Sequence, residues 1–136
     1  MTNPELAGTA ALLLRISLAI LFFAHAWLKI KVFTPAGTVK YFASLGVPGW
    51  FAYATVAAEI GGGALLLLGI ETRWVALLLV PLLLGTIVLV HGKNGWQFTN
   101  SGGGWEYPAF WIVGLLALAL LGDGSAALGP MMGLPG

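Results

Sequence analysis

The fold is decided by residues 50–91, which read WFAYATVAAEIGGGALLLLGIETRWVALLLVPLLLGTIVLVH. Two apolar runs, 50–70 and 72–91, stand on either side of a short polar turn around Glu71, and each has about the 20 residues that cross a bilayer core. Because the connection is so short, the runs are predicted to form an antiparallel helical hairpin. The leucine run at 65–68 lacks the alternation of a barrel strand, so the spans are predicted to be helices, which satisfy their own backbone groups in lipid.

Two further apolar runs, about 9–28 and 107–122, flank this hairpin. Over the whole chain 59% of residues are hydrophobic, 8% are charged, and the mean hydropathy is +0.94. A soluble domain carries about 25% charged residues, so this chain cannot cover a water-facing surface. We therefore expect one multi-pass domain over residues 1–136, an all-α antiparallel bundle of four transmembrane helices whose main partner is the lipid bilayer.

The connection between the first two spans is predicted to hold a short helix that lies on the membrane surface. Thr34 can cap such a helix, Pro35 suits its first turn, and Gly46 suits the position just beyond its end. Its apolar stripe consists of Val39, Phe42 and Leu45. A single apolar stripe beside Lys40 is typical of an interfacial helix.

Charge and cysteine content exclude several function classes. The net charge of +1 gives no reason to expect a nucleic-acid partner, and the absence of cysteine excludes thiol–disulfide chemistry and iron–sulfur clusters. Residues Met1–Gly8 carry Glu5 and no basic residue, whereas a secretory signal peptide begins with a positive region. We therefore expect the first run to be a membrane span and not a cleaved signal.

The chemistry of the chain is predicted to reside in polar residues at one end of the bundle. Because the helices alternate in direction, one membrane face receives the end of the first span, the start of the second, the end of the third and the start of the fourth. The candidates that this topology gathers are His25, Lys29, His91, Glu106 and Tyr107, with Glu59 about 14 Å inside the second span and tilted toward the same face. We call this predicted cluster the polar cup.

Glu59 is the strongest single candidate, because polar groups inside a span are costly and need a reason. Small neighbours such as Thr55, Gly62 and Gly63 indicate that its face of the helix meets other helices and not lipid. A structural ion pair or hydrogen bond with Arg15 or a histidine is the alternative to a functional role. His25 and His91 can equally face headgroups as helix-end residues, Glu106 can serve the helix dipole, and Arg15 can reach the membrane surface.

Metal binding is not expected. Two histidines and two carboxylates are suitable ligand types, but they come from four helices without the Glu-x-x-His spacing of di-iron bundles.

A series of short motifs runs in order along most of the chain. It goes from Leu14-Arg15-Ile16 and His25-x-x-x-Lys29, through Ser44-Leu45-Gly46-Val47-Pro48 and Glu59-Ile60-Gly61-Gly62, to Gly69-x-x-Thr72-Arg73, His91 and Glu106-Tyr107-Pro108. In the order and spacing of these motifs the chain closely resembles the DoxX family of small bacterial and archaeal membrane proteins. The resemblance implies a multi-pass protein of the cytoplasmic membrane. It also implies redox work, since relatives include a thiosulfate:quinone oxidoreductase subunit and partners of oxidative-stress enzymes.

The leading hypothesis is a redox-associated subunit that binds a quinone-like or other small apolar ligand. In it, His25, His91 and Glu106 hydrogen-bond the ligand, Glu59 exchanges a proton with it, and His25 and Glu59 are the catalytic candidates. Lys29, Tyr107 and Arg15 complete the expected ligand-binding set. No internal electron carrier is present, so a redox role needs a partner redox protein, and a homo-oligomer is an open alternative. The sequence leaves open whether the chain is an enzyme at all, because a docking or assembly protein with a structural polar cluster also fits.

Overall fold

The computed structural model describes residues 3–136, and these form helices and connecting turns without a β-strand. Met1 and Thr2, which belong to the expected domain and leader, lie outside the described residues. The main helices are α1 (Pro4–Trp27), α2 (Pro35–Ser44), α3 (Trp50–Leu68), α4 (Thr72–Thr86), α5 (Glu106–Leu121) and the short α6 (Leu128–Met131). Two π-helical turns, η1 (Leu28–Val32) and η2 (Ile87–His91), extend α1 and α4, and a 3-10 turn, η3 (Gly92–Asn94), follows η2.

The predicted membrane bundle is confirmed. The segments Pro4–Val32, Trp50–Leu68 and Thr72–Asn94 are each long and apolar enough to cross a membrane, and α5 is a shorter apolar helix of 16 residues. At 1.5 Å per residue α5 is about 24 Å long, a little less than the hydrocarbon core of about 30 Å. The first helix begins at Pro4, earlier than expected, because the Asn3 side chain caps it by accepting a hydrogen bond from the N–H of Glu5 at 2.9 Å.

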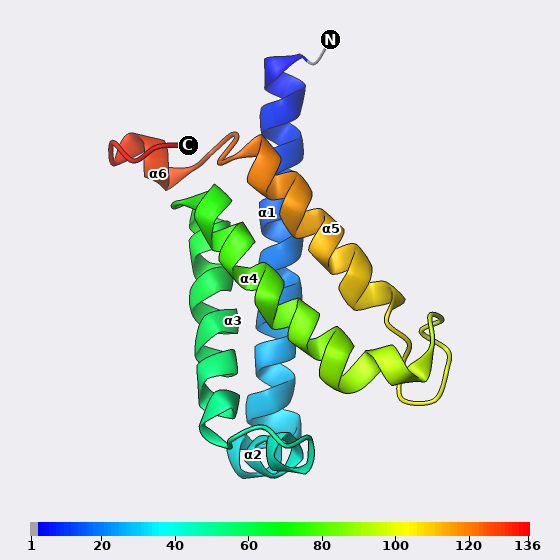
Figure 1. Cartoon of the computed structure of the whole chain (residues 1–136). Helices are drawn as coiled ribbons and strands as arrows, with labels where there is room; N and C mark the ends of the chain where they lie inside the picture. The colour runs from blue at the N-terminus through cyan, green and yellow to red at the C-terminus, as the bar shows by residue number, and fades with distance from the viewer. Residues whose placement is uncertain (1–2) are drawn as a thin grey trace.

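The four long helices pack as two antiparallel pairs. α1 packs mainly against α3, and α4 packs mainly against α5 (Figure 1). The two pairs share a core that includes the fully buried Phe22, Leu66, Ala76, Leu115 and Leu118. In Figure 1 the α4–α5 hairpin crosses the first pair obliquely, so its connecting loop lies apart from α2 at the same end of the molecule.

The short helix α2 forms where the sequence predicts it, at the end of the α1–α3 pair (Figure 1). The Thr34 side chain accepts the N–H of Gly37 at 3.2 Å, Pro35 occupies the first turn, and Gly46 just beyond the helix has φ +80°. Thr38 ties α2 to α1, because its hydroxyl lies 3.0 Å from the carbonyl oxygen of Lys29. The helix is therefore fixed to the bundle through a buried side chain.

The opposite end of the bundle is closed by Arg15. Its guanidinium is fully buried, and its nitrogens donate to five backbone carbonyls at 2.7–3.2 Å. These acceptors lie at the end of α3 and in the segment after α5; they are Leu66, Leu67, Asp123, Ser125 and Ala126. The last carbonyls of a helix lack partners within it, so Arg15 supplies donors to groups that need them in an apolar setting; Leu66 also accepts the N–H of Gly69 at 3.2 Å.

Gly69 and Asp123 complete this closed end. Gly69 ends α3 with φ +72°, and a Cβ there would lie 2.5 Å from the Cβ of Ala127 and 2.9 Å from Cζ of Arg15. Asp123 is 3% exposed, and its carboxylate accepts the N–H of Thr72 at 3.3 Å, at the start of α4. From the sequence alone, Asp123 is expected to be a charged residue at the membrane surface. In the structure it is buried and caps the start of α4, about 50 residues earlier in the chain.

Replacing Arg15 with Lys is expected to destabilise the bundle by about 3 kcal/mol, because a single ammonium cannot satisfy five carbonyls in a fork geometry. The measurement is the free energy of unfolding in detergent, followed by circular dichroism during denaturant titration. Arg73→Lys is the matched control: Arg73 is exposed, so its replacement is expected to change the free energy by less than about 0.5 kcal/mol. Equal stability of the two variants would contradict this account of Arg15.

Candidate functional site

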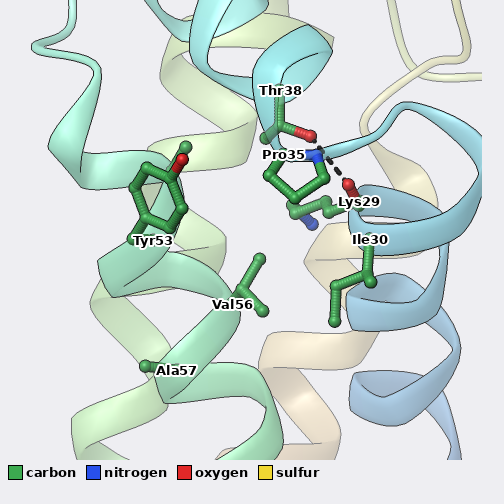
Figure 2. A pocket seen from close by; sticks show the side chains of 8 residues that line it. Lys29, Ile30, Pro35, Thr38, Tyr53, Val56 and Ala57 are labelled. Atoms are coloured by element: carbon green, nitrogen blue, oxygen red, sulfur yellow. Dashed lines mark hydrogen bonds between the residues drawn. The ribbon is translucent and has the colours of Figure 1, made fainter.

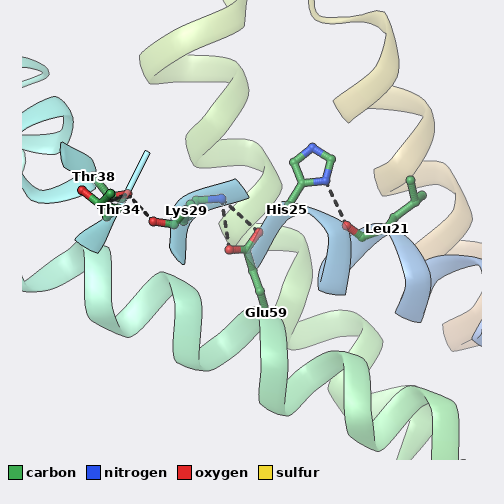
Figure 3. A network of polar contacts seen from close by, with 6 residues as sticks. All are labelled: Leu21, His25, Lys29, Thr34, Thr38 and Glu59. Atoms are coloured by element: carbon green, nitrogen blue, oxygen red, sulfur yellow. Dashed lines mark hydrogen bonds and ion pairs between the residues drawn. The ribbon is translucent and has the colours of Figure 1, made fainter. Parts of the chain in front are cut away.

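An ion pair between α3 and the end of α1 lies at the end of the bundle that carries α2. The Nζ atom of Lys29 is 3.0 Å from Oε1 and 3.2 Å from Oε2 of Glu59 (Figure 3). The Glu59 side chain is only 5% exposed, and that of Lys29 is 18% exposed. The prediction that Glu59 faces the protein interior is confirmed, and its partner is Lys29, not Arg15 or a histidine.

Small residues make this burial feasible. A Cβ added to Gly62 would lie 2.8 Å from the Leu79 side chain of α4, and one added to Gly63 would lie 2.9 Å from the Phe23 side chain of α1. The face of α3 that carries Glu59 is therefore the face on which two other helices approach closely. The stripe of small residues in the sequence indicated this packing correctly.

A second polar pair joins the end of α4 to the start of α5. The hydroxyl of Tyr107 lies 2.7 Å from Nε2 of His91, and Nδ1 of His91 lies 2.9 Å from the carbonyl oxygen of Gly103. The carbonyl can only accept, so the network assigns the proton to Nδ1, and Nε2 then accepts from the tyrosine hydroxyl. His91 is thus held in one tautomer by the loop that precedes α5.

His25 lies between these two pairs and is the less satisfied histidine. Its Nδ1 lies 2.9 Å from the carbonyl oxygen of Leu21 and donates to it, which leaves Nε2 as an acceptor (Figure 3). Within residues 3–136, no protein group donates to that Nε2. The His25 ring is centred 6.2 Å from the Tyr107 ring and 4.7 Å from the Trp111 ring. The ring that carries this unpaired acceptor therefore lies beside two aromatic rings.

Trp111 is the functional candidate that the sequence did not assign. It is 5% exposed, it packs on both His25 and Phe22 at 4.7 Å between ring centres, and its buried indole N–H has no acceptor among the described residues. A buried donor without a partner is costly and needs an explanation. The available signal was its position, because it is the one tryptophan in the interior of a predicted span while the others lie at span ends.

A cavity of about 220 Å³ opens beside the ion pair, between η1, α2 and α3. Figure 2 shows Pro35, Ile30, Tyr53 and Val56 around it, with Lys29 at one side. Apolar atoms supply nearly all of its wall. An apolar cavity of about 150 Å³ is enough to hold a benzene ring, so this one can take a ring or a branched alkyl segment.

Two residues of the expected ligand-binding set lie elsewhere. Arg15 is at the opposite end of the bundle and its guanidinium is bound to five carbonyls, so the structure does not bring it together with the other residues of the expected ligand-binding set. Glu106 lies at the start of α5, where it lines a separate groove, and no hydrogen bond or ion pair joins its side chain to the cup within residues 3–136. The structure thus gathers five of the expected residues; they are His25, Lys29, Glu59, His91 and Tyr107.

Within the described chain, no three His, Asp or Glu side chains lie close enough together to hold a metal ion. The site is instead an arrangement of hydrogen-bonding and aromatic groups. It contains one free acceptor, one free donor and a nearby ion pair that can exchange a proton.

The comparisons place the chain among bacterial membrane proteins. The DoxX family model matches residues 10–92. A Bacillus subtilis (strain 168) protein named "Putative oxidoreductase CatD" is 34% identical over 121 residues, which cover 89% of this chain and 85% of the relative. Inner membrane protein YqjF of Escherichia coli (strain K12) is 33% identical over 91% of this chain and 92% of its own length. Inner membrane protein YphA of the same strain is 35% identical over 86% of this chain and 86% of its own length. No solved structure gives a significant match.

Replacing Lys29 with Met is expected to destabilise the protein by about 3 kcal/mol, because the carboxylate of Glu59 is then buried without its partner. The double variant Lys29→Met with Glu59→Met is expected to recover most of this loss, since no unpaired charge remains. A double-mutant cycle of unfolding free energies measures the coupling between the two side chains. Lys31→Met is the control, because Lys31 is exposed and has no ion pair among the described residues; additive effects of the two single substitutions would show that the pair is not coupled.

Proposed function

This chain belongs to the DoxX family, and we propose that it is a redox-associated subunit of the cytoplasmic membrane that binds a quinone-like ligand at His25 and Trp111. The observation that carries the proposal is the contact between two rings whose centres are 4.7 Å apart: half-buried His25, whose Nε2 is a free acceptor, and buried Trp111, whose indole N–H is a free donor among the described residues. Few small molecules need one donor and one acceptor next to an aromatic wall inside a membrane. Quinones and quinols do, because they are apolar rings with oxygens that accept in one redox state and donate in the other.

The chemistry of a quinol is the release of two electrons and two protons on oxidation. His25 Nε2 is placed to accept a proton from a ligand hydroxyl, and its bond to the Leu21 carbonyl keeps the ring in the accepting tautomer. The indole N–H of Trp111 is a donor for a ligand carbonyl, which it would hold in position without exchanging a proton. Neutral His25 therefore matches a quinol hydroxyl, and the imidazolium that forms when Nε2 takes its proton can donate to a quinone oxygen. In this proposal the second proton is assigned to the Glu59 carboxylate and the two electrons to a partner protein.

Glu59 and Lys29 are assigned to proton handling in this proposal. Lys29 follows His25 by four residues, about one helical turn, so the ion pair lies near His25 along the chain. Glu59 is nearly enclosed by protein, whereas Lys29 is partly exposed at the end of the bundle. The proposal therefore assigns Glu59 as the carboxylate that exchanges a proton and Lys29 as the cation that stabilises its charged form.

The apolar cavity beside Lys29 is lined by neither His25 nor Trp111, and in this proposal it receives only a substituent of the ligand. Electrons need a carrier that the side chains of this chain do not supply. We therefore assign the electron transfer to a partner redox protein. The name of the CatD relative contains the word oxidoreductase, which is in keeping with this assignment.

The non-enzymatic alternative keeps one specific observation in its favour. His91, Tyr107, Lys29 and Glu59 all find partners within the protein, as they would if the cluster only fixed the helices. In that case the chain is a docking or assembly partner in the membrane. The experiment below separates the two functions through the two groups that have no partner.

Replacing Trp111 with Phe, which retains an aromatic ring and loses the N–H, is expected to weaken binding of a short-chain quinone about tenfold, as is His25→Ala. Binding is measured by native mass spectrometry and by quenching of tryptophan fluorescence in detergent, with unfolding midpoints recorded to show that both variants fold. Trp74→Phe is the matched control, because Trp74 is 64% exposed near the start of α4. Unchanged quinone affinity in both site variants, or a protein purified with phospholipid alone, would favour the docking function.

A further inference from the structure

The groove that Glu106 lines is distinct from the quinone-like site, and it has the features of a lipid site. It has a volume of about 550 Å³ and lies on the outside of α5, against the loop that connects α4 to α5. Glu106 is the one charged residue that lines it among residues 3–136, and aromatic residues such as Trp96, Phe98 and Phe110 form much of its wall. Figure 1 shows that loop at the free end of the α4–α5 hairpin.

The polarity of the groove changes along the helix. Glu106 opens α5, and Val113 lines the same groove seven residues later, about 10 Å further along the axis. Phe98 and Phe110 are 65% and 75% exposed, so they are available to an occupant and are not part of the protein core. A carboxylate at the membrane-surface end and apolar side chains below it match an amphiphile with a cationic group in its head.

The loop holds the polar end of this groove in a fixed form. The backbone N–H of Glu106 donates to the carbonyl of Trp96 at 3.0 Å, and the ring of Trp96 packs edge-on against Trp105 at 4.6 Å between centres. Within the described residues, the indole N–H of Trp96 and the carboxylate of Glu106 have no hydrogen-bond or ion-pair partner. The groove therefore offers an acceptor for an ammonium, a donor for a phosphate, and aromatic faces that attract cations.

We infer that this groove binds an aminophospholipid, with the ammonium of its headgroup at Glu106 and an acyl chain along Phe110 and Val113. The charge of the groove decides the choice of lipid. An anionic headgroup such as glycerol phosphate brings no cation to Glu106, whereas ethanolamine phosphate brings an ammonium and a phosphate to the two unpaired groups. The selection is therefore for the ammonium and not for phospholipid in general.

The position of Glu106 also has a simpler explanation, the helix dipole, and the experiment must distinguish this effect from lipid binding. A carboxylate in the first turn of a helix is stabilised by the helix dipole whatever it binds. Glu5 also lies in the first turn of its helix, α1, and it is exposed and does not line this groove. Glu5→Gln and Glu106→Gln therefore each remove a helix-dipole interaction of the same kind, and only Glu106→Gln changes the groove.

The experiment is competition between phosphatidylethanolamine and phosphatidylglycerol with identical acyl chains, added in equal amounts to the delipidated full chain and read by native mass spectrometry. The wild-type protein is expected to bind phosphatidylethanolamine preferentially, and Glu106→Gln is expected to reduce that preference about fivefold. Glu5→Gln and His25→Ala are expected to retain it, so failure here is distinguishable from failure of the quinone proposal. Unfolding midpoints in phosphatidylglycerol alone show whether Glu106→Gln folds. Trp96→Phe provides a second variant that keeps the carboxylate, and it is expected to reduce the preference for phosphatidylethanolamine by less than Glu106→Gln does.

Three results would overturn the inference. Equal binding of the two lipids by the wild-type protein would mean that the groove is covered by unselected bilayer lipid. An equal loss of preference in Glu5→Gln would assign the effect to helix-end charge. A lipid-free dimer that persists in the spectrum and is dissociated by Phe110→Ser would mean that a second copy of the chain covers the groove.

Discussion

The structure depends on the requirement that polar groups within a membrane find partners inside the protein. Arg15 shows how far this requirement shapes the chain. A guanidinium in the first helix would be very costly in hydrocarbon, yet it gathers five carbonyls from the end of α3 and from the segment after α5. One side chain thereby closes an end of the bundle, and it explains why residues 122–126 fold back over the helices instead of continuing α5. Gly69 and Asp123 follow from the same arrangement, since both lie against this centre.

The other end of the bundle carries the candidate site. Lys29 pairs with Glu59 and Tyr107 with His91 there, whereas His25 Nε2 and the Trp111 N–H have no partner among the described residues. The Arg15 end also holds unpartnered buried oxygens, one each on Thr72 and Asp123. What distinguishes the site is therefore the kind of groups that are free, a donor and an acceptor on two aromatic rings in contact, and not the lack of pairing alone.

The sequence predicted most of the fold because the signals were strong and local. Apolar runs of about 20 residues and the short turn around Glu71 led to the four helices, and Thr34, Pro35 and Gly46 led to α2. Topology led to the juxtaposition of His25, Lys29, Glu59, His91 and Tyr107. It did not lead to their partners, because pairing depends on helix rotation and on distances of a few ångström. Arg15 was misplaced for this reason: its acceptors are backbone carbonyls, which are identical in every residue and leave no pattern in the sequence.

Glu106 is a second residue whose contacts the sequence did not predict. Glu106 and Tyr107 are adjacent in the chain and start the same helix, so the sequence placed both in one cup. Adjacent residues of a helix point about 100° apart, so the Tyr107 hydroxyl reaches His91 whereas the Glu106 carboxylate does not, although both side chains line the groove. Tyr107 also lines the groove, so it is the one residue that belongs to both sites. An occupant of the groove would therefore contact the ring whose hydroxyl orients His91. The lipid-facing surface and the quinone-like site are two sides of the first turn of α5, and the state of one is physically connected to the geometry of the other.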